Sequence, residues 1–109
     1  MRILFPASTI GPVTVLSDLA ALIPDARDRL KGVARITPVE LNQRLTEATG
    51  SEVWLKREDL QPVRSYKLRG AYNLISQLPP EARDAGVVCA SAGNHGQGVA
   101  FAAATLGIG

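Results

Sequence analysis

A lysine in the first turn of a predicted helix is the residue of this sequence best placed for covalent chemistry. The stretch RSYKLRGAYN predicts a helix from Tyr66 with Ser65 as its N-cap, so that Lys67 falls in the first turn. The unpaired amide groups of a helix start disfavour an ammonium, and two neighbouring arginines add positive charge. Such surroundings favour a neutral amine, which can attack a carbonyl group to form a Schiff base. The alternative is a solvated lysine whose side chain swings away from the helix end.

A glycine-rich stretch, SAGNHGQG at residues 91–98, is the second candidate for chemistry. Its glycines allow other groups to approach the backbone closely, and the amides at the start of the next helix offer an anion site for a carboxylate or phosphate. The order Gly-x-x-Gly-x-Gly differs from the dinucleotide-binding fingerprint, and no P-loop lysine follows it. The alternative is a tight connection between a strand and a helix with no ligand.

Two predicted strands must place these two stretches. Residues 51–58 and 86–91 contain short β-prone runs, and each leads through a loop into a helix, the first over residues 66–77 and the second ending at Gly107. The order strand, helix, strand, helix is typical of an α/β fold with a parallel sheet flanked by helices. Ligands bind at the carboxyl ends of the strands in such sheets, so we expect Lys67 and the glycine-rich stretch to face one cavity.

The remaining elements follow from helix-start and helix-stop residues. Ser17 is the expected cap of the first helix, and Pro24 is expected to restart it. The opening residues 1–16 are apolar, but two prolines and a single basic residue favour an ordered arm over a signal peptide. We expect a helix over residues 17–31, an edge strand around residues 34–38, a helix over about residues 40–49 and a short helical turn over residues 79–85.

Composition excludes several classes of protein. With 46% hydrophobic and 20% charged residues, the 109-residue chain is typical of a globular protein. A net charge of +2, with basic residues interleaved among acidic ones, does not indicate a nucleic-acid partner. Cys89 and His95 are each the single residue of their type, so we expect no internal disulfide and no metal site. No apolar run is long enough to span a membrane, and a reducing, cytoplasmic compartment fits best.

Taken together, SYKLRGAYN and SAGNHGQGVA, with KRED upstream, resemble the pyridoxal-phosphate enzymes of the tryptophan-synthase-β fold group. Within that group they look like the biosynthetic threonine dehydratases (threonine ammonia-lyases), and the resemblance covers roughly residues 37–107. It implies an α/β fold of which this chain is the first portion, with an arm and helices at residues 1–36 and an incomplete catalytic domain at residues 37–109. It also implies pyridoxal 5′-phosphate as the cofactor.

The resemblance implies a role for each residue of the site. Lys67 would be the catalytic residue and bond covalently to the cofactor aldehyde, Tyr66 would lie beside the cofactor ring, and Asn94 would hydrogen-bond the ring hydroxyl. Gly96 departs from the alanine usual in that family, and the loop for the cofactor phosphate and the partner of the pyridine nitrogen lie beyond Gly109 in such enzymes. The substrate carboxylate would bind the backbone amides and the serine hydroxyl of Ser91, Ala92, Gly93, Asn94 and His95.

The activity that the resemblance implies is the deamination of L-threonine to 2-oxobutanoate and ammonia, the first step of isoleucine biosynthesis. The full-length protein would be a homo-oligomer whose small-molecule partner is an amino acid. A serine dehydratase, a serine racemase and a β-replacing synthase are alternatives with the same cofactor. A non-catalytic module that binds an anion or a nucleotide is an alternative of another class, and the isolated chain is expected to be an inactive fragment.

We expect structural rather than catalytic roles for five other residues. Cys89 is expected to pack in its strand as a small apolar side chain, and Trp54 to lie in the core. Glu58 and Asp59 are expected to fix the loop after the first strand through ion pairs or backbone hydrogen bonds. His95 is expected to hydrogen-bond the backbone rather than to act as a base.

Overall fold

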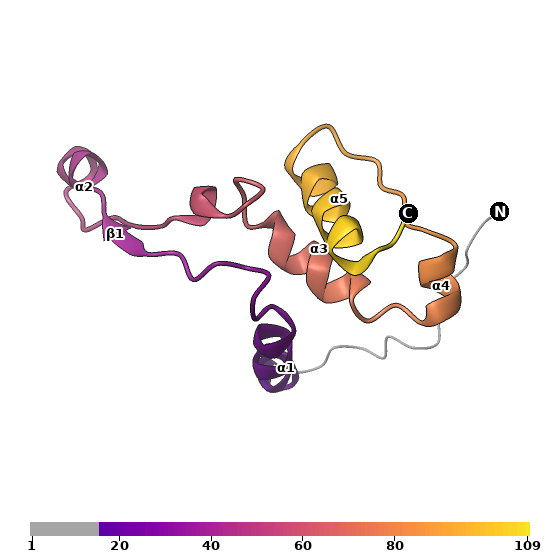
Figure 1. Cartoon of the computed structure of the whole chain (residues 1–109). Helices are drawn as coiled ribbons and strands as arrows, with labels where there is room; N and C mark the ends of the chain where they lie inside the picture. Colours follow the sequence, from indigo (N-terminus) through magenta and orange to yellow (C-terminus); the bar gives the residue numbers. More distant parts are fainter. Residues whose placement is uncertain (1–15) are drawn as a thin grey trace.

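The computed structural model describes residues 16–109, with most of the helices at one end of an elongated chain and a small sheet at the other (Figure 1). The arm expected over residues 1–16 lies, except for its last residue, outside the described residues. The elements in chain order are α1 (Leu16–Arg29), β1 (Val39–Leu41), α2 (Gln43–Thr49), β2 (Trp54–Lys56), the 3-10 turn η1 (Glu58–Leu60), α3 (Lys67–Ile75), α4 (Pro80–Asp84) and α5 (Asn94–Leu106).

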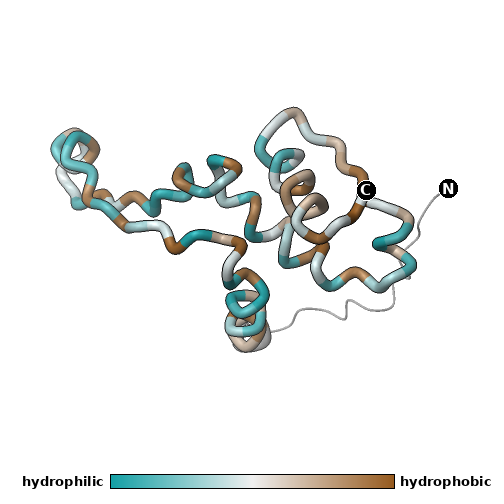
Figure 2. Tube along the Cα trace, in the orientation of Figure 1, coloured by the Kyte–Doolittle hydropathy of each residue, from teal (hydrophilic) through white to brown (hydrophobic). Residues whose placement is uncertain are grey.

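Helices α3 and α5 lie side by side and supply most of the core (Figure 1). Leu68, Ala71 and Ile75 recur at helical spacing on α3 and are buried, as the pattern of the sequence predicts. Ala102 and Ala103 of α5 are buried as well, and their small side chains allow the two helices to come close. Figure 2 shows hydrophobic residues gathered where the two helices meet. Full burial of a leucine contributes about 1.5–3 kcal/mol, so Leu68 anchors the start of α3 in the core.

Three helix boundaries follow the predicted signals. Gly50 and Gly107 end α2 and α5, and both adopt the left-handed conformation, with φ of 69° and 68°. Pro80 stands at the first position of α4, where its missing N–H has no helical partner to lose. The short helical turn expected over residues 79–85 is therefore confirmed.

The sheet differs from the prediction. The run at residues 51–58 does not join a parallel sheet; its central part is β2, which pairs antiparallel with β1. Asn42 explains the local fold, because its side chain accepts a hydrogen bond from the Leu45 amide at 2.9 Å and so caps α2. The seven-residue helix that follows is short enough to bring the chain back alongside β1. The helix expected from about residue 40 accordingly begins at Gln43, and the expected edge strand lies just after residue 38.

The second predicted strand, residues 86–91, has no regular secondary structure and joins no sheet within residues 16–109. The Val87 amide donates to the Gly109 carbonyl oxygen at 3.0 Å, the backbone bond by which this segment touches the last residue of the chain. A strand needs at least one neighbouring strand to pair with, and β1 and β2 lie at the other end of the molecule (Figure 1). The expected parallel sheet is thus not formed by these residues, which give helices and one small antiparallel sheet.

Two residues expected in packed surroundings are exposed instead. Cys89 lies in the segment of residues 86–91 and is exposed, since no second strand covers it in the described part of the chain. Trp54 is 55% exposed, and its indole Nε1 donates to Glu52 at 3.4 Å on the surface of the sheet. Both expectations were wrong for the same reason: apolar character predicts burial, but burial also needs a layer to pack against.

The first helix is longer than predicted at its start and shorter at its end. Helix α1 runs through Pro24 without restarting there, and Ser17 lies within it rather than before it. Its last turn is joined to the core region by Arg29, whose Nε donates to Asn73 Oδ1 of α3 at 2.7 Å. None of the helices between residues 16 and 109 is both long and apolar enough to cross a membrane.

Candidate active site

Lys67 is the first residue of α3, as the sequence predicts for a first-turn position. Its side chain is half-buried, and its Nζ lies 4.9 Å from the centre of the Tyr66 ring. Tyr66 itself is 59% exposed at the helix start. A cation over an aromatic face is attracted to it, by about 0.5–1 kcal/mol at an exposed site. The lysine and the tyrosine therefore form one accessible unit at the start of α3.

Ser65 does not cap α3. Helix α3 begins at Lys67, so Tyr66 (φ −68°, ψ −12°) stands at the N-cap position, Ser65 lies one residue before it, and no side chain caps the helix. The Oγ of Ser65 is buried and has no hydrogen-bond partner among residues 16–109. The turn before it depends on Arg64, whose φ of 58° is the one left-handed value of a non-glycine residue in the described chain. Such strain costs about 1–3 kcal/mol and is common beside functional sites.

The amine of Lys67 also differs from the amines of the other two lysines in its hydrogen-bond and ion-pair partners. Lys31 pairs with Asp28 at 2.8 Å, and Lys56 donates to the Thr37 carbonyl oxygen at 2.5 Å. Across residues 16–109 the Lys67 amine has neither a carboxylate nor a carbonyl partner. A nucleophilic amine must be free to reach its electrophile. Lys67 is therefore the lysine best suited to bond a carbonyl compound.

The glycine-rich stretch is only partly a turn. Residues 91–93 precede α5, and the Gly93 amide donates to Ser91 Oγ at 3.3 Å. The remaining residues already belong to the helix, so Gly96 and Gly98 lie within α5 rather than in a loop. No side chain caps the start of α5, so its first amides remain available to an anion. The residues predicted to bind the substrate carboxylate are all exposed here: Ser91, Ala92, Gly93, Asn94 and His95.

Gly98 brings the two candidate stretches together. It is buried, and a methyl group on its Cα would lie 3.1 Å from the carbonyl carbon and oxygen of Lys67 and 3.2 Å from the Leu68 amide nitrogen. Only glycine permits this approach of one helix backbone to another without displacement. The start of α3 is thus held against α5 four residues, about one turn, after Asn94. The roles predicted for Tyr66, Lys67 and the Ser91–His95 segment remain predictions, but the chain brings these residues to one region.

Two hollows of the described chain lie away from the expected cavity. A hollow of about 430 Å³ lies between residues 35–38 and residues 60–64, and another of about 550 Å³ lies between residues 40–42 and residues 55–59. Lys67 lines neither of them. Because Tyr66 and residues 91–95 are exposed, the candidate residues lie on the surface at the starts of α3 and α5.

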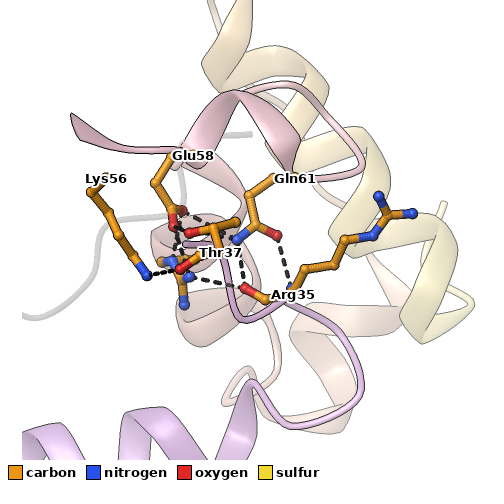
Figure 3. A network of polar contacts seen from close by, with 6 residues as sticks. Arg35, Thr37, Lys56, Glu58 and Gln61 are labelled. Atoms are coloured by element: carbon orange, nitrogen blue, oxygen red, sulfur yellow. Dashed lines mark hydrogen bonds and ion pairs between the residues drawn. The ribbon is translucent and has the colours of Figure 1, made fainter. Parts of the chain in front are cut away.

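A polar network behind the start of α3 was only half predicted (Figure 3). Asp59 pairs with Arg57 at 2.9 Å, and Glu58 pairs with Arg69 of α3 at 2.8 Å, which confirms the ion pairs expected of the two carboxylates. Sequence reasoning missed the neutral members, because Thr37 and Gln61 carry no charge that marks a partner. Thr37 Oγ1 donates to Glu58 at 2.6 Å, and the Gln61 side chain is almost completely buried.

Because of this network, we expect the stability of the folded chain to depend on the charge of Glu58. The Arg69 hydrogen bond, aided by those of Thr37 and Gln61, lowers the pKa of this carboxyl from 4.5 to about 2. The folded chain then binds fewer protons than the unfolded chain between these values, so the stabilisation is complete above pH 4.5 and is lost as the pH falls toward 2. Urea unfolding of the wild type at a series of pH values should show this loss of stability. In Glu58→Gln, the part of the loss that comes from protonation of Glu58 should be absent. The exposed Glu81→Gln is the control, and parallel acid profiles for wild type and Glu58→Gln would contradict the expectation.

Comparison with known proteins gives one family and several relatives. The family described as "Pyridoxal-phosphate dependent enzyme" matches residues 30–109. The biosynthetic L-threonine dehydratase IlvA of Mycobacterium leprae is 59% identical over 86 residues, which are 79% of this chain and 20% of that protein. The corresponding protein of Corynebacterium glutamicum is 56% identical over 89 residues, 82% of this chain and 20% of its own length. The chain thus spans about a fifth of the length of these curated relatives.

Solved structures agree with this likeness. The processed form of threonine deaminase isoform 2 from Solanum lycopersicum superposes with a TM-score of 0.73 at 43% identity, over 86% of this chain and 28% of that chain. Maize serine racemase superposes with a TM-score of 0.73 at 35% identity, over 81% of this chain and 28% of that chain. The arrangement of helices and small sheet described above is therefore similar to part of both enzymes.

Proposed function

We propose, from the premise that this chain belongs to the pyridoxal-phosphate-dependent enzymes, that it serves the deamination of L-threonine to 2-oxobutanoate and ammonia. The observation that carries the proposal is Lys67 at the start of α3, whose amine has no carboxylate or carbonyl partner among residues 16–109 and which Gly98 holds beside the start of α5. The substrate follows from the relatives, since those at 54–59% identity include threonine dehydratases from four bacterial genera.

The residues of the chain fit the cofactor. Its aldehyde needs a free amine, and Lys67 provides one; its ring needs an apolar or aromatic neighbour, and the exposed Tyr66 lies within reach of that amine. The uncapped start of α5 suits a carboxylate. Lys67 would hold pyridoxal phosphate covalently, Tyr66 would lie beside its ring, and Asn94 would hydrogen-bond the ring hydroxyl.

Each residue has a task in the reaction. Bound pyridoxal phosphate supplies an electron-accepting ring that stabilises negative charge at the α-carbon of an amino acid. The backbone amides from Ala92 to His95, with the Ser91 hydroxyl, would hold the substrate carboxylate and so fix the direction of the α-hydrogen. Lys67 Nζ would take the α-proton. Threonine then loses its β-hydroxyl as water, and hydrolysis of the resulting enamine gives 2-oxobutanoate and ammonia.

The pathway, the compartment and the oligomeric state are part of the same proposal. The reaction would be the first step of isoleucine biosynthesis, in the cytoplasm, by a homo-oligomer. A second candidate is racemisation or dehydration of serine, which the likeness to two serine racemases at 35–38% identity favours. Both candidates use the same residues at the starts of α3 and α5, so the substrate must be tested directly.

A pair of hybrid enzymes tests the substrate. The 86 residues that match in the Mycobacterium leprae dehydratase are replaced by those of this chain, and the matching residues of maize serine racemase are replaced in the same way. We expect the first hybrid to keep threonine turnover within about tenfold of its parent, because a tenfold change corresponds to about 1.4 kcal/mol and the site residues are retained. We expect the second hybrid to lose more of its parent's activity.

Assays of 2-oxobutanoate and of D-serine measure the two outcomes. The 109-residue chain alone, with pyridoxal phosphate and threonine, is the control and should give no turnover, because it spans about a fifth of the relatives' length. A folded first hybrid without activity, beside an active second hybrid, would contradict the threonine assignment and favour the serine candidate.

A further inference from the structure

The carboxylate of Glu58 is held to the start of α3 by a two-point ion pair. Arg69 donates to it twice, from Nε to Oε2 at 2.8 Å and from Nη2 to Oε1 at 2.9 Å. Two parallel bonds fix the plane of the guanidinium as well as its distance, which a single hydrogen bond does not do. The Glu58 side chain is 15% exposed and that of Arg69 is 36% exposed, so water reaches the pair mainly from the side of the arginine.

The same carboxylate is tied to the segment before β1 (Figure 3). Thr37 Oγ1 donates to Glu58 Oε1, and Gln61 bridges to Arg35, whose amide donates to Gln61 Oε1 at 2.9 Å and whose carbonyl oxygen accepts from Gln61 Nε2 at 2.8 Å. Arg69 Nη2 also donates to that carbonyl oxygen at 3.2 Å. Through Arg69, the start of α3 is therefore fastened to two separate segments of the chain.

Lys67 lies two residues before Arg69 on the same helix. Positions two apart are separated by roughly 200° around a helix axis, so Arg69 restrains the first turn from the side away from Lys67. Leu68 between them is fully buried, and Gly98 of α5 touches the Lys67 carbonyl group. Core, neighbouring helix and ion pair thus hold the backbone of this turn, while the Lys67 amine makes no bond to any of the three.

We propose that Glu58 and Arg69 are positioning residues, which fix the first turn of α3 and thereby the direction in which Lys67 presents its amine. This inference rests on the proposed function, in which that amine bonds the cofactor. Neither residue needs to touch cofactor or substrate for this role. Misplacement of a reacting group by about 1 Å can slow a reaction about 10²-fold, so a restraint on this turn matters for reactivity as well as for folding.

Asp59 offers a matched control. Like Glu58 it belongs to η1 and accepts a two-point pair from an arginine, with both Arg57 bonds at 2.9 Å. It is exposed, and none of its hydrogen bonds within the described chain reaches α3. Asp59→Asn therefore removes a comparable ion pair while leaving the helix that carries Lys67 untouched.

The test measures the reactivity of Lys67 in the full 109-residue chain. The chain is exposed briefly to pyridoxal phosphate and reduced with borohydride, and the label at each lysine is counted by peptide mass spectrometry. Lys31, a surface residue of another segment, is the internal reference, so the measured quantity is the Lys67-to-Lys31 labelling ratio. The ratio in concentrated urea represents an amine without positioning, and circular dichroism reports helix content. All native samples contain an osmolyte that is excluded from the protein surface, because such osmolytes favour the folded state.

We expect the wild-type ratio to exceed the urea ratio about tenfold, as a positioned amine should. Asp59→Asn should keep that ratio, Glu58→Gln should lose most of the excess with its helix content unchanged, and Arg69→Lys should fall between. A wild-type ratio in folded Glu58→Gln would overturn the proposal. If Glu58→Gln loses its helices, Arg69→Lys decides, with a wild-type ratio overturning the proposal and an intermediate one supporting it. A wild-type chain that labels as in urea would instead contradict the proposed role of Lys67 itself.

Discussion

Replacing Lys67 by alanine is expected to abolish specific covalent uptake of pyridoxal phosphate and, in the Mycobacterium leprae hybrid, to lower threonine turnover by at least about 10³-fold. The amine would serve twice, as the covalent anchor of the cofactor and as the base that takes the α-proton. Loss of a positioned base alone costs about 10²–10⁴-fold, and loss of the anchor adds to it. No other lysine of the chain can take over, because Lys31 and Lys56 are paired and lie on other segments.

The controls separate chemistry from folding. Lys67→Arg keeps a positive charge at the helix start but offers no amine that forms a Schiff base, so it should be as inactive as Lys67→Ala. Lys56→Ala removes the bond to the Thr37 carbonyl oxygen without touching α3, and it should retain turnover. Borohydride trapping with peptide mapping measures the attachment. A Lys67→Ala hybrid that still carries trapped label and turns over threonine would refute the assignment.

The helical parts of this fold could be predicted because their signals are local. The spacing of Leu68, Ala71 and Ile75 marks the buried face of α3, and each lies within two turns of the next. Gly107 ends α5 in the left-handed conformation that glycine readily adopts. This preference is a property of the residue itself and does not depend on a distant segment of the chain. For the same reason the position of Lys67 at a helix start, and thus the candidate nucleophile, could be read before the structure.

The strands could not be predicted in the same way, because pairing is a property of two segments. The apolar run around Trp54 favours a strand but does not encode the direction of its neighbour. The parallel arrangement was inferred from element order, whereas the short α2 brings β2 back antiparallel to β1. Residues 86–91 show the same dependence, since the apolar run that predicts a strand pairs with no strand among residues 16–109 and has no regular secondary structure.

The supports of the site were predicted least well. Ser65 was chosen as the cap by its residue type, but α3 begins at Lys67, so Tyr66 rather than Ser65 stands at the N-cap position. Thr37 and Glu58 are 21 residues apart, and Arg35 and Gln61 are 26 apart, so their bonds leave no periodic trace in the sequence. The glycines of residues 91–98 were assigned to a binding turn, although two of them lie inside α5.

One of those two glycines gives the second large prediction. Gly98→Ala should lower the free energy of unfolding by about 1–3 kcal/mol, the usual cost of forcing an extra carbon into a packed interface. The new methyl would lie 3.1 Å from backbone atoms of Lys67, and a backbone group in a helix start cannot turn aside as a flexible side chain does. Helix α5 must therefore move away from α3, which also displaces the Ser91–His95 segment from Lys67.

Two other glycines isolate this contact from the intrinsic preference of helices for alanine. Gly70 of α3 is exposed and has open space at its Cβ position, so Gly70→Ala should raise stability by up to about 1 kcal/mol. At Gly96 a methyl would meet Ser91 Cβ at 3.5 Å, an ordinary contact, so Gly96→Ala should also be tolerated. Urea unfolding measures the three variants, and Lys67 labelling measures the coupling. Because all three changes add the same methyl to a helix, a loss confined to Gly98→Ala, in stability and in Lys67 labelling together, identifies the α3–α5 contact as its cause. Equal stability of the three variants would show that the two helix starts are not held together at this point.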